Sequence, residues 1–167
     1  MRQARLLRLV LIQLPTIEKQ MKNLYNAFGS FCSTLLSPVA NLWARIYVGL
    51  IFWRSGTAKF ADMEETVENF DPAEDGDFVI SFLPESLPAE IPAYLATFGE
   101  LVLPIMLFVG LLTRIGALGL LIMTAVIQFF VPGFENHEHY LWAIILVMLM
   151  AHGGGKLSLD NWLLKEK

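Results

Sequence analysis

The sequence predicts an all-α integral membrane protein built as a four-helix bundle. Hydrophobic residues make up 55% of the 167 residues and charged residues only 17%, whereas charged residues are about a quarter of a soluble domain. The mean hydropathy is +0.53. A helix needs about 20 mostly apolar residues to cross the hydrocarbon core of a bilayer. Four apolar stretches between helix breakers therefore predict spans at residues 41–60, 92–112, 115–131 and 138–152.

Residues 1–40 form a basic arm ahead of the first predicted span. The apolar run at residues 6–14 is too short to span, and no small-residue cleavage site follows it, so a signal peptide is disfavoured. A basic helix lying on the membrane surface fits the pattern. The alternative is that the natural protein starts at Met21 and that the first twenty residues do not belong to it. The sequence leaves both interpretations open.

The segment between the first two spans, residues 61–91, contains ten acidic residues and no basic one. Segments of this length are usually functional or disordered. Residues 71–77 are similar to a calcium-binding loop, but Ala73 and Phe82 stand where ligands should be, so calcium binding is disfavoured. We expect the apolar residues 78–83 to pack onto the bundle as a lid.

The fourth span is short for a full crossing. We expect it to start within residues 135–139 or to lie in locally thinned bilayer. A tail at residues 156–167 follows it.

Basic residues predict the orientation, because Lys and Arg in short loops stay on the cytoplasmic side. They lie in the N-terminal arm, at Arg114 between the second and third spans, and in the tail. Both termini are therefore expected in the cytoplasm, with the acidic segment outside an inner (plasma) membrane.

The net charge of -4 argues against a nucleic-acid partner, and the single Cys32 excludes an internal disulfide.

Several short motifs follow one another in a specific order. Residues 45–60 read RIYVGLIFWRSGTAKF, residues 98–100 read FGE, residues 110–114 read GLLTR, and residues 153–160 read GGGKLSLD. Together they resemble the motifs of the DoxX family of membrane proteins, over about residues 41–165. The resemblance implies a four-helix bundle and a membrane subunit associated with oxidoreductases or quinol oxidases. The acidic segment departs from the family pattern and is not assigned a family function.

A charged side chain at the centre of a spanning helix costs about 2.5 to 3.5 kcal/mol on insertion scales, so it normally has a partner. Glu100 lies about 12 Å below the outer end of the second span, at about 1.5 Å per residue. One face of the first span carries Arg45, Lys59 and two glycines, and Arg54 points nearly the opposite way. Because glycines favour close helix packing, we expect Lys59 to pair with Glu100. Arg45 is the alternative partner, and Arg54 is left for headgroups or a partner subunit.

Pro104 lacks an N–H and so frees the carbonyl of Glu100, which predicts a polar pocket in the outer half of the bundle. Gln128 lies at a depth where it could join this pocket. Under this hypothesis Glu100 and Lys59 are the catalytic residues, and Arg45, Gln128 and Arg54 bind the ligand. A purely structural pair that fixes helix register is the equally weighted alternative.

Two histidines, His137 and His139, lie at the outer mouth. They are weak candidates for zinc or copper, and a polar turn is the favoured interpretation.

No nucleotide loop or nucleophile–base set names a reaction. We therefore expect a DoxX-like subunit of a redox assembly, linked to quinone or to metal or oxidative stress, that is not a self-sufficient enzyme. The alternative is a non-enzymatic partner, exporter component or anchor that docks another protein through the acidic segment. The expected partners are the lipid bilayer and either another protein or further copies of this chain in a homo-oligomer.

Overall fold

The computed structural model describes residues 2–74, 76–84 and 86–163, with side chains from residue 17 onward except that of Glu74. Every regular element in these residues is helical, and the all-α class is confirmed. Asp75, Glu85 and the last four residues of the tail contribute to the predicted charge pattern but lie outside the described residues.

The chain divides into two units, Met1–Val39 and Ala40–Lys167. The first contains α1 (Arg2–Phe31) and a π-helical segment, η1 (Cys32–Leu36). At the end of η1 the Ser37 N–H donates to the Cys32 carbonyl, five residues earlier. A hydrogen bond over five residues makes the helix wider here than an α-helix. The wide turn lies directly before Pro38, whose nitrogen has no hydrogen to donate. The arm is thus helical, and its place on a membrane surface stays a prediction.

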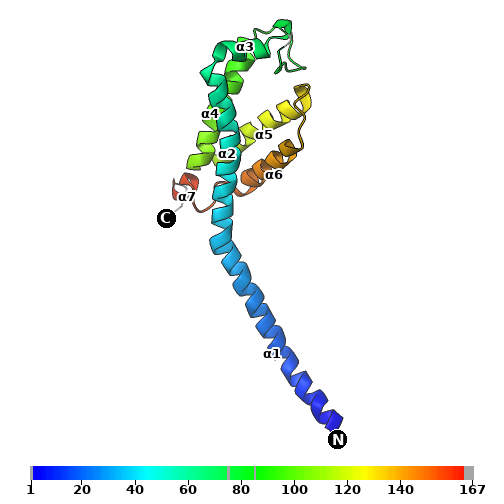
Figure 1. Cartoon of the computed structure of the whole chain (residues 1–167). Coiled ribbons are helices and arrows are strands. Elements are labelled where there is room, and N and C mark those ends of the chain that lie inside the picture. Colours follow the sequence, from blue (N-terminus) through cyan, green and yellow to red (C-terminus); the bar gives the residue numbers. More distant parts are fainter. Residues whose placement is uncertain (1, 75, 85, 164–167) are drawn as a thin grey trace. The chain divides into compact units, whose positions relative to one another are not determined.

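The helices after η1 carry the rest of the fold (Figure 1). They are α2 (Ser37–Ala61), α3 (Met63–Phe70), the 3-10 turn η2 (Pro72–Glu74), α4 (Glu90–Val109), α5 (Thr113–Phe130), α6 (His137–His152) and α7 (Leu159–Leu163). Helices α2, α4, α5 and α6 cover the four predicted spans to within a few residues at each end.

Local signals set the ends of these helices. Helix α4 stops at Gly110, whose φ of 72° is the left-handed conformation that glycine tolerates. The N–H groups of Gly110 and Leu111 both donate to the Met106 carbonyl. Asp62 caps the start of α3 and Asn136 caps the start of α6, each by accepting from a backbone N–H at 3.0 Å.

Four helices share one buried core, to which α2, α4, α5 and α6 contribute Val48, Phe52, Leu107, Ala117, Leu120, Leu146 and Leu149. Their outward faces carry large exposed apolar side chains, among them Leu95, Val102, Ile122 and Ile144. Such faces are unfavourable in water and suited to lipid.

Three helical stretches among the described residues are long and apolar enough to cross a bilayer: Ile17–Ala61, Glu90–Val109 and Thr113–Phe130. Helix α6 has 16 residues, fewer than the about 20 of a full span. The chain is an all-α, multi-pass membrane protein.

The acidic segment is more ordered than a connecting loop. It contains α3 and η2. The Thr66 hydroxyl lies within hydrogen-bond distance of the carbonyls of Lys59, near the end of α2, and of Asp62, the cap of α3. Phe70 packs with Ala89 and Ala93 in a second, smaller core. The segment therefore folds back onto α4 and does not extend freely.

Candidate functional site

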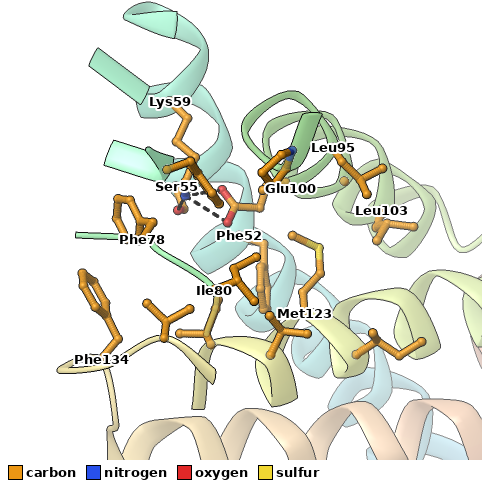
Figure 2. Close-up of a pocket in the computed structure, with 18 of the residues that line it drawn as sticks. Phe52, Ser55, Lys59, Phe78, Ile80, Leu95, Glu100, Leu103, Met123 and Phe134 are labelled. Carbon is orange, nitrogen blue, oxygen red and sulfur yellow. Dashed lines mark hydrogen bonds and ion pairs between the residues drawn. The ribbon is translucent and has the colours of Figure 1, made fainter. Parts of the chain in front are cut away.

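A cavity of about 560 Å³ opens among α2, α4, α5, α6 and the segment 78–83. This volume is in the range of small-molecule sites in proteins. Most of its wall is apolar, and it includes Phe52, Leu95, Leu103, Ile122, Met123 and Trp142. Figure 2 shows the labelled part of this wall around Glu100. The cavity is thus largely apolar, whereas the sequence predicted a polar pocket.

The polar part of the wall is built around the ion pair of Lys59 and Glu100. Lys59 Nζ lies 2.8 Å from Glu100 Oε2, 3.0 Å from Oε1 and 2.7 Å from Ser55 Oγ. Figure 2 shows these side chains meeting between α2 and α4. An ammonium group has three hydrogens to donate, so each hydrogen of Lys59 has an acceptor. The predicted pairing of Lys59 with Glu100 is confirmed.

Both members of the pair are shielded from solvent. The Lys59 side chain is 13% exposed and that of Glu100 is 4% exposed. In such surroundings each charge depends on the other, because an unpaired buried ion is strongly unfavourable. The pair is therefore fixed in the cavity wall.

The segment 78–83 closes one side of the cavity. The Phe78 ring lies 5.2 Å from Lys59 Nζ, within range of a cation–π contact, and 4.8 Å from the Phe134 ring. The Ser81 N–H and hydroxyl both donate to the Phe130 carbonyl, at 2.9 and 3.0 Å. The packing of this apolar segment onto the helices is as predicted.

Helix α6 adds His139 to the wall, and a second layer of polar groups holds this ring. Gln128 Oε1 lies 2.7 Å from His139 Nδ1 and accepts from the Asn136 N–H at 3.1 Å. The His139 and Trp142 rings are 4.7 Å apart. Gln128 is buried but does not line the cavity. Gln128 therefore positions the His139 ring and does not itself line the cavity, where the sequence had placed it as a ligand-binding residue.

Arg45 and Arg54, predicted as ligand-binding residues, do not line the cavity. Arg45 is fully buried near the other end of α2, where it donates to the carbonyls of Leu107 and Leu157. Fourteen helical residues separate it from Lys59, a rise of about 21 Å, so it cannot reach a ligand beside Glu100. Arg54 is exposed on α2.

The two histidines predicted as candidate metal ligands differ in burial. His139 is 6% exposed, whereas His137 is exposed beside Tyr140. Among the described residues, no three His, Cys, Asp or Glu side chains are grouped so that they could hold a metal ion.

At the Arg45 end of the molecule, Asp160 joins the C-terminal segment to the start of α5. Its carboxylate accepts from the N–H groups of Leu112 and Thr113 at 2.7 and 2.9 Å. Burial raises the pKa of Asp160, but these backbone hydrogen bonds and the charge of Arg45 outweigh it and hold the pKa below its ordinary value.

Sequence reasoning did not find this contact of Asp160. The sequence does contain a signal for it. Leu112 at the start of α5 has no side-chain oxygen to cap the helix, so the first N–H groups of α5 need an acceptor from another part of the chain. The GLLTR motif therefore meets the end of the GGGKLSLD motif here, and this contact stabilises the fold at a distance from the cavity.

The fold and the site together define an α-helical membrane protein with a ligand-sized apolar cavity and one buried ion pair in its wall. Residues 40–133 match the sequence model of the DoxX family, and this range is more than half of the chain. The chain belongs to the DoxX family. The matched range includes Lys59 and Glu100 and ends before His139.

One relative comes from Haemophilus influenzae and is described as an uncharacterized protein. It is 28% identical over 137 residues, which cover 77% of this chain and 86% of that protein. No solved structure matches the chain.

Proposed function

We propose that this DoxX protein is an inner-membrane subunit of a redox assembly, linked to quinone or to oxidative or metal stress, and that its cavity holds a quinone head group. The supporting observation is the position of Glu100, a buried carboxylate paired with Lys59 in the wall of an otherwise apolar cavity. Ionisable residues inside a membrane protein commonly mark proton or substrate paths. The apolar wall suits the ring and tail of a quinone.

In this function, Glu100 handles a proton and Lys59 holds the carboxylate in place. Oxidation of a quinol to a quinone releases two electrons and two protons. The electrons pass to a redox centre on a partner subunit, so this chain is a component and not a self-sufficient enzyme. Glu100 suits this task because its carboxylate oxygens can accept a proton at the wall of the cavity in which the ring lies.

The proposed placement has four spans, with α2, α4, α5 and α6 crossing an inner membrane and both termini in the cytoplasm. Arg114 and Lys156 would then lie on the cytoplasmic side and the acidic α3 on the outside, as the retention of basic residues favours. Helix α6 would cross with its N-terminal flank, residues 135–136, or in thinned bilayer.

The alternative function is a non-enzymatic membrane partner, exporter component or anchor. Helix α3 favours it, because Glu64, Glu65 and Glu68 are exposed while Thr66 and Phe70 are buried. Together with the exposed Arg54 on α2, this charged surface would dock another protein. Charge-reversing substitutions on α3 would then release a co-purifying partner.

Native mass spectrometry of the detergent-purified chain tests the quinone function. We expect the wild type to retain a quinone, and Glu100→Gln to retain at least about tenfold less per mole of folded protein, an effect that corresponds to about 1.4 kcal/mol of binding free energy. Glu135→Gln is the matched control, since Glu135 is exposed and outside the cavity wall. A Glu100→Gln chain that keeps its full quinone load would contradict the function.

A further inference from the structure

We infer that the cavity binds the hydroxyl-bearing, reduced form of its ring ligand, a hydroquinone, in preference to the quinone, and that His139 accepts one of the hydroxyl hydrogens. This deepens the proposed function and rests on it. The inference follows from the hydrogen-bonding roles of Ser55, Lys59, Glu100 and His139 in the wall. Trp142 also lines the cavity, but its indole Nε1 is itself buried and has no partner among the described residues.

The orientation of the Gln128 amide fixes the role of one ring nitrogen of His139. Gln128 Oε1 accepts from the backbone N–H of Asn136, which can only donate. The atom at this position must therefore be the oxygen of the amide and not its nitrogen. Because His139 Nδ1 lies 2.7 Å from the same oxygen, Nδ1 must carry a hydrogen and donate it.

The other ring nitrogen, Nε2, is then an acceptor. A neutral imidazole has one donor and one acceptor nitrogen, and burial of the ring at 6% exposure disfavours the charged form. His139 lines the cavity, and Nε2 has no hydrogen-bond partner among the side chains and backbone that the structure describes. The ring therefore offers an unused acceptor at the cavity wall.

The remaining polar groups add mainly acceptors. Glu100 is a carboxylate, and all three hydrogens of Lys59 are already donated to Glu100 and Ser55. The Ser55 hydroxyl accepts from Lys59 and keeps a single hydrogen to donate. The indole N–H of Trp142 is a further donor in the wall, but the nitrogen has almost no accessible surface. A ligand that enters this cavity therefore meets Glu100 and His139 as acceptors and the Ser55 hydroxyl as the accessible donor.

This pattern distinguishes the two redox forms of a quinone. Quinone carbonyl oxygens can only accept hydrogen bonds. When such an oxygen faces His139 Nε2, neither atom has a hydrogen to donate, so no hydrogen bond forms between them. Each hydroxyl of a hydroquinone can donate to such an acceptor. One additional hydrogen bond of this kind corresponds to about a tenfold difference in affinity at most.

Calorimetric titration of the full-length chain in detergent tests the inference, under anaerobic conditions. The probes are a short-tailed hydroquinone, the corresponding quinone, and the dimethyl ether of the hydroquinone, which has the same ring without donors. We expect the wild type to bind the hydroquinone about fivefold to tenfold more tightly than either other probe. His139→Phe keeps a ring but removes the acceptor, and the ratio should fall at least about threefold. Ser55→Ala, which removes the competing donor, should not lower the ratio.

A second variant, Gln128→Leu, keeps the histidine but removes the acceptor that holds Nδ1 as a donor. It should also lower the ratio, and a melting curve for each variant confirms that it is folded. If both redox forms bind equally to the wild type, if the quinone binds more tightly, or if folded His139→Phe and Gln128→Leu chains leave the ratio unchanged, the inference is overturned and the proposed function stands. If the wild type binds none of the three probes, the proposed function fails and the inference fails with it.

Discussion

Gly56 on α2 lies against the backbone of Glu100 on α4. A Cβ added to Gly56 would lie 2.8 Å from Glu100 Cβ and 3.0 Å from its carbonyl carbon, closer than packed atoms tolerate. The missing side chain therefore lets the two helices approach at the level of the cavity. Lys59, three residues further along α2, reaches the Glu100 carboxylate because of this approach.

Gly56→Ala should therefore force α2 and α4 apart. Overpacking of this kind costs about 1 to 3 kcal/mol, and the melting temperature of the purified protein in detergent should fall. Gly29→Ala is the matched control, because nothing lies within 4 Å of a Cβ at that helical position. It should leave the melting temperature unchanged or raise it slightly. Equal shifts in the two variants would show that the close approach does not stabilise the fold.

Lys59→Met should destabilise the chain more than removal of both charges does. The single change leaves the buried Glu100 carboxylate unpaired, at a cost of about 3 to 5 kcal/mol. The double variant Lys59→Met, Glu100→Gln removes the unpaired charge and should recover a large part of that loss. Denaturant unfolding in detergent measures the three chains side by side. A double variant less stable than Lys59→Met would contradict a pair whose members depend on each other.

The pairing of Lys59 with Glu100 was predictable because it follows from helical periodicity. The face shared by Lys59 and the two glycines can be read from spacing alone, and Glu100 needs a partner wherever it is buried. The end of the second span was predicted three residues too late, at residue 112, because the left-handed conformation of Gly110 stops α4 at Val109.

The partners of Arg45 and Asp160 were not predictable in this way. The hydrogen bond of Arg45 to the Leu157 carbonyl joins residues 112 positions apart, and that of the Leu112 N–H to Asp160 joins residues 48 apart. Periodicity assigns a residue to a face but does not specify which distant backbone group reaches it. Arg45 was therefore assigned to the Glu100 site, although backbone carbonyls bind it at the other end of α2.

Asp160→Asn should destabilise the chain at neutral pH, because a helix cap contributes about 0.5 to 2 kcal/mol. The pKa of Asp160 in the folded chain lies below its ordinary value of 3.8. The carboxylate therefore stabilises the fold above about pH 3.8, and this contribution is lost as the pH falls through the lowered folded pKa. The difference in melting temperature between wild type and Asp160→Asn should be constant near pH 7 and shrink below pH 3.8. A difference that grows on acidification would contradict the assigned role.

The proposed crossing by α6 can be tested by labelling single cysteines on intact cells. With Cys32→Ser as the background, Glu135→Cys and Lys156→Cys place exposed thiols before and after α6. A membrane-impermeant maleimide should label Glu135→Cys directly and Lys156→Cys only after permeabilisation, because a helix that crosses separates its two flanks. Arg114→Cys is the control for the cytoplasmic side and should behave like Lys156→Cys. Labelling of positions 135 and 156 from the same side would show that 16 helical residues do not cross, and the fold would then have an odd number of spans between residues 37 and 152.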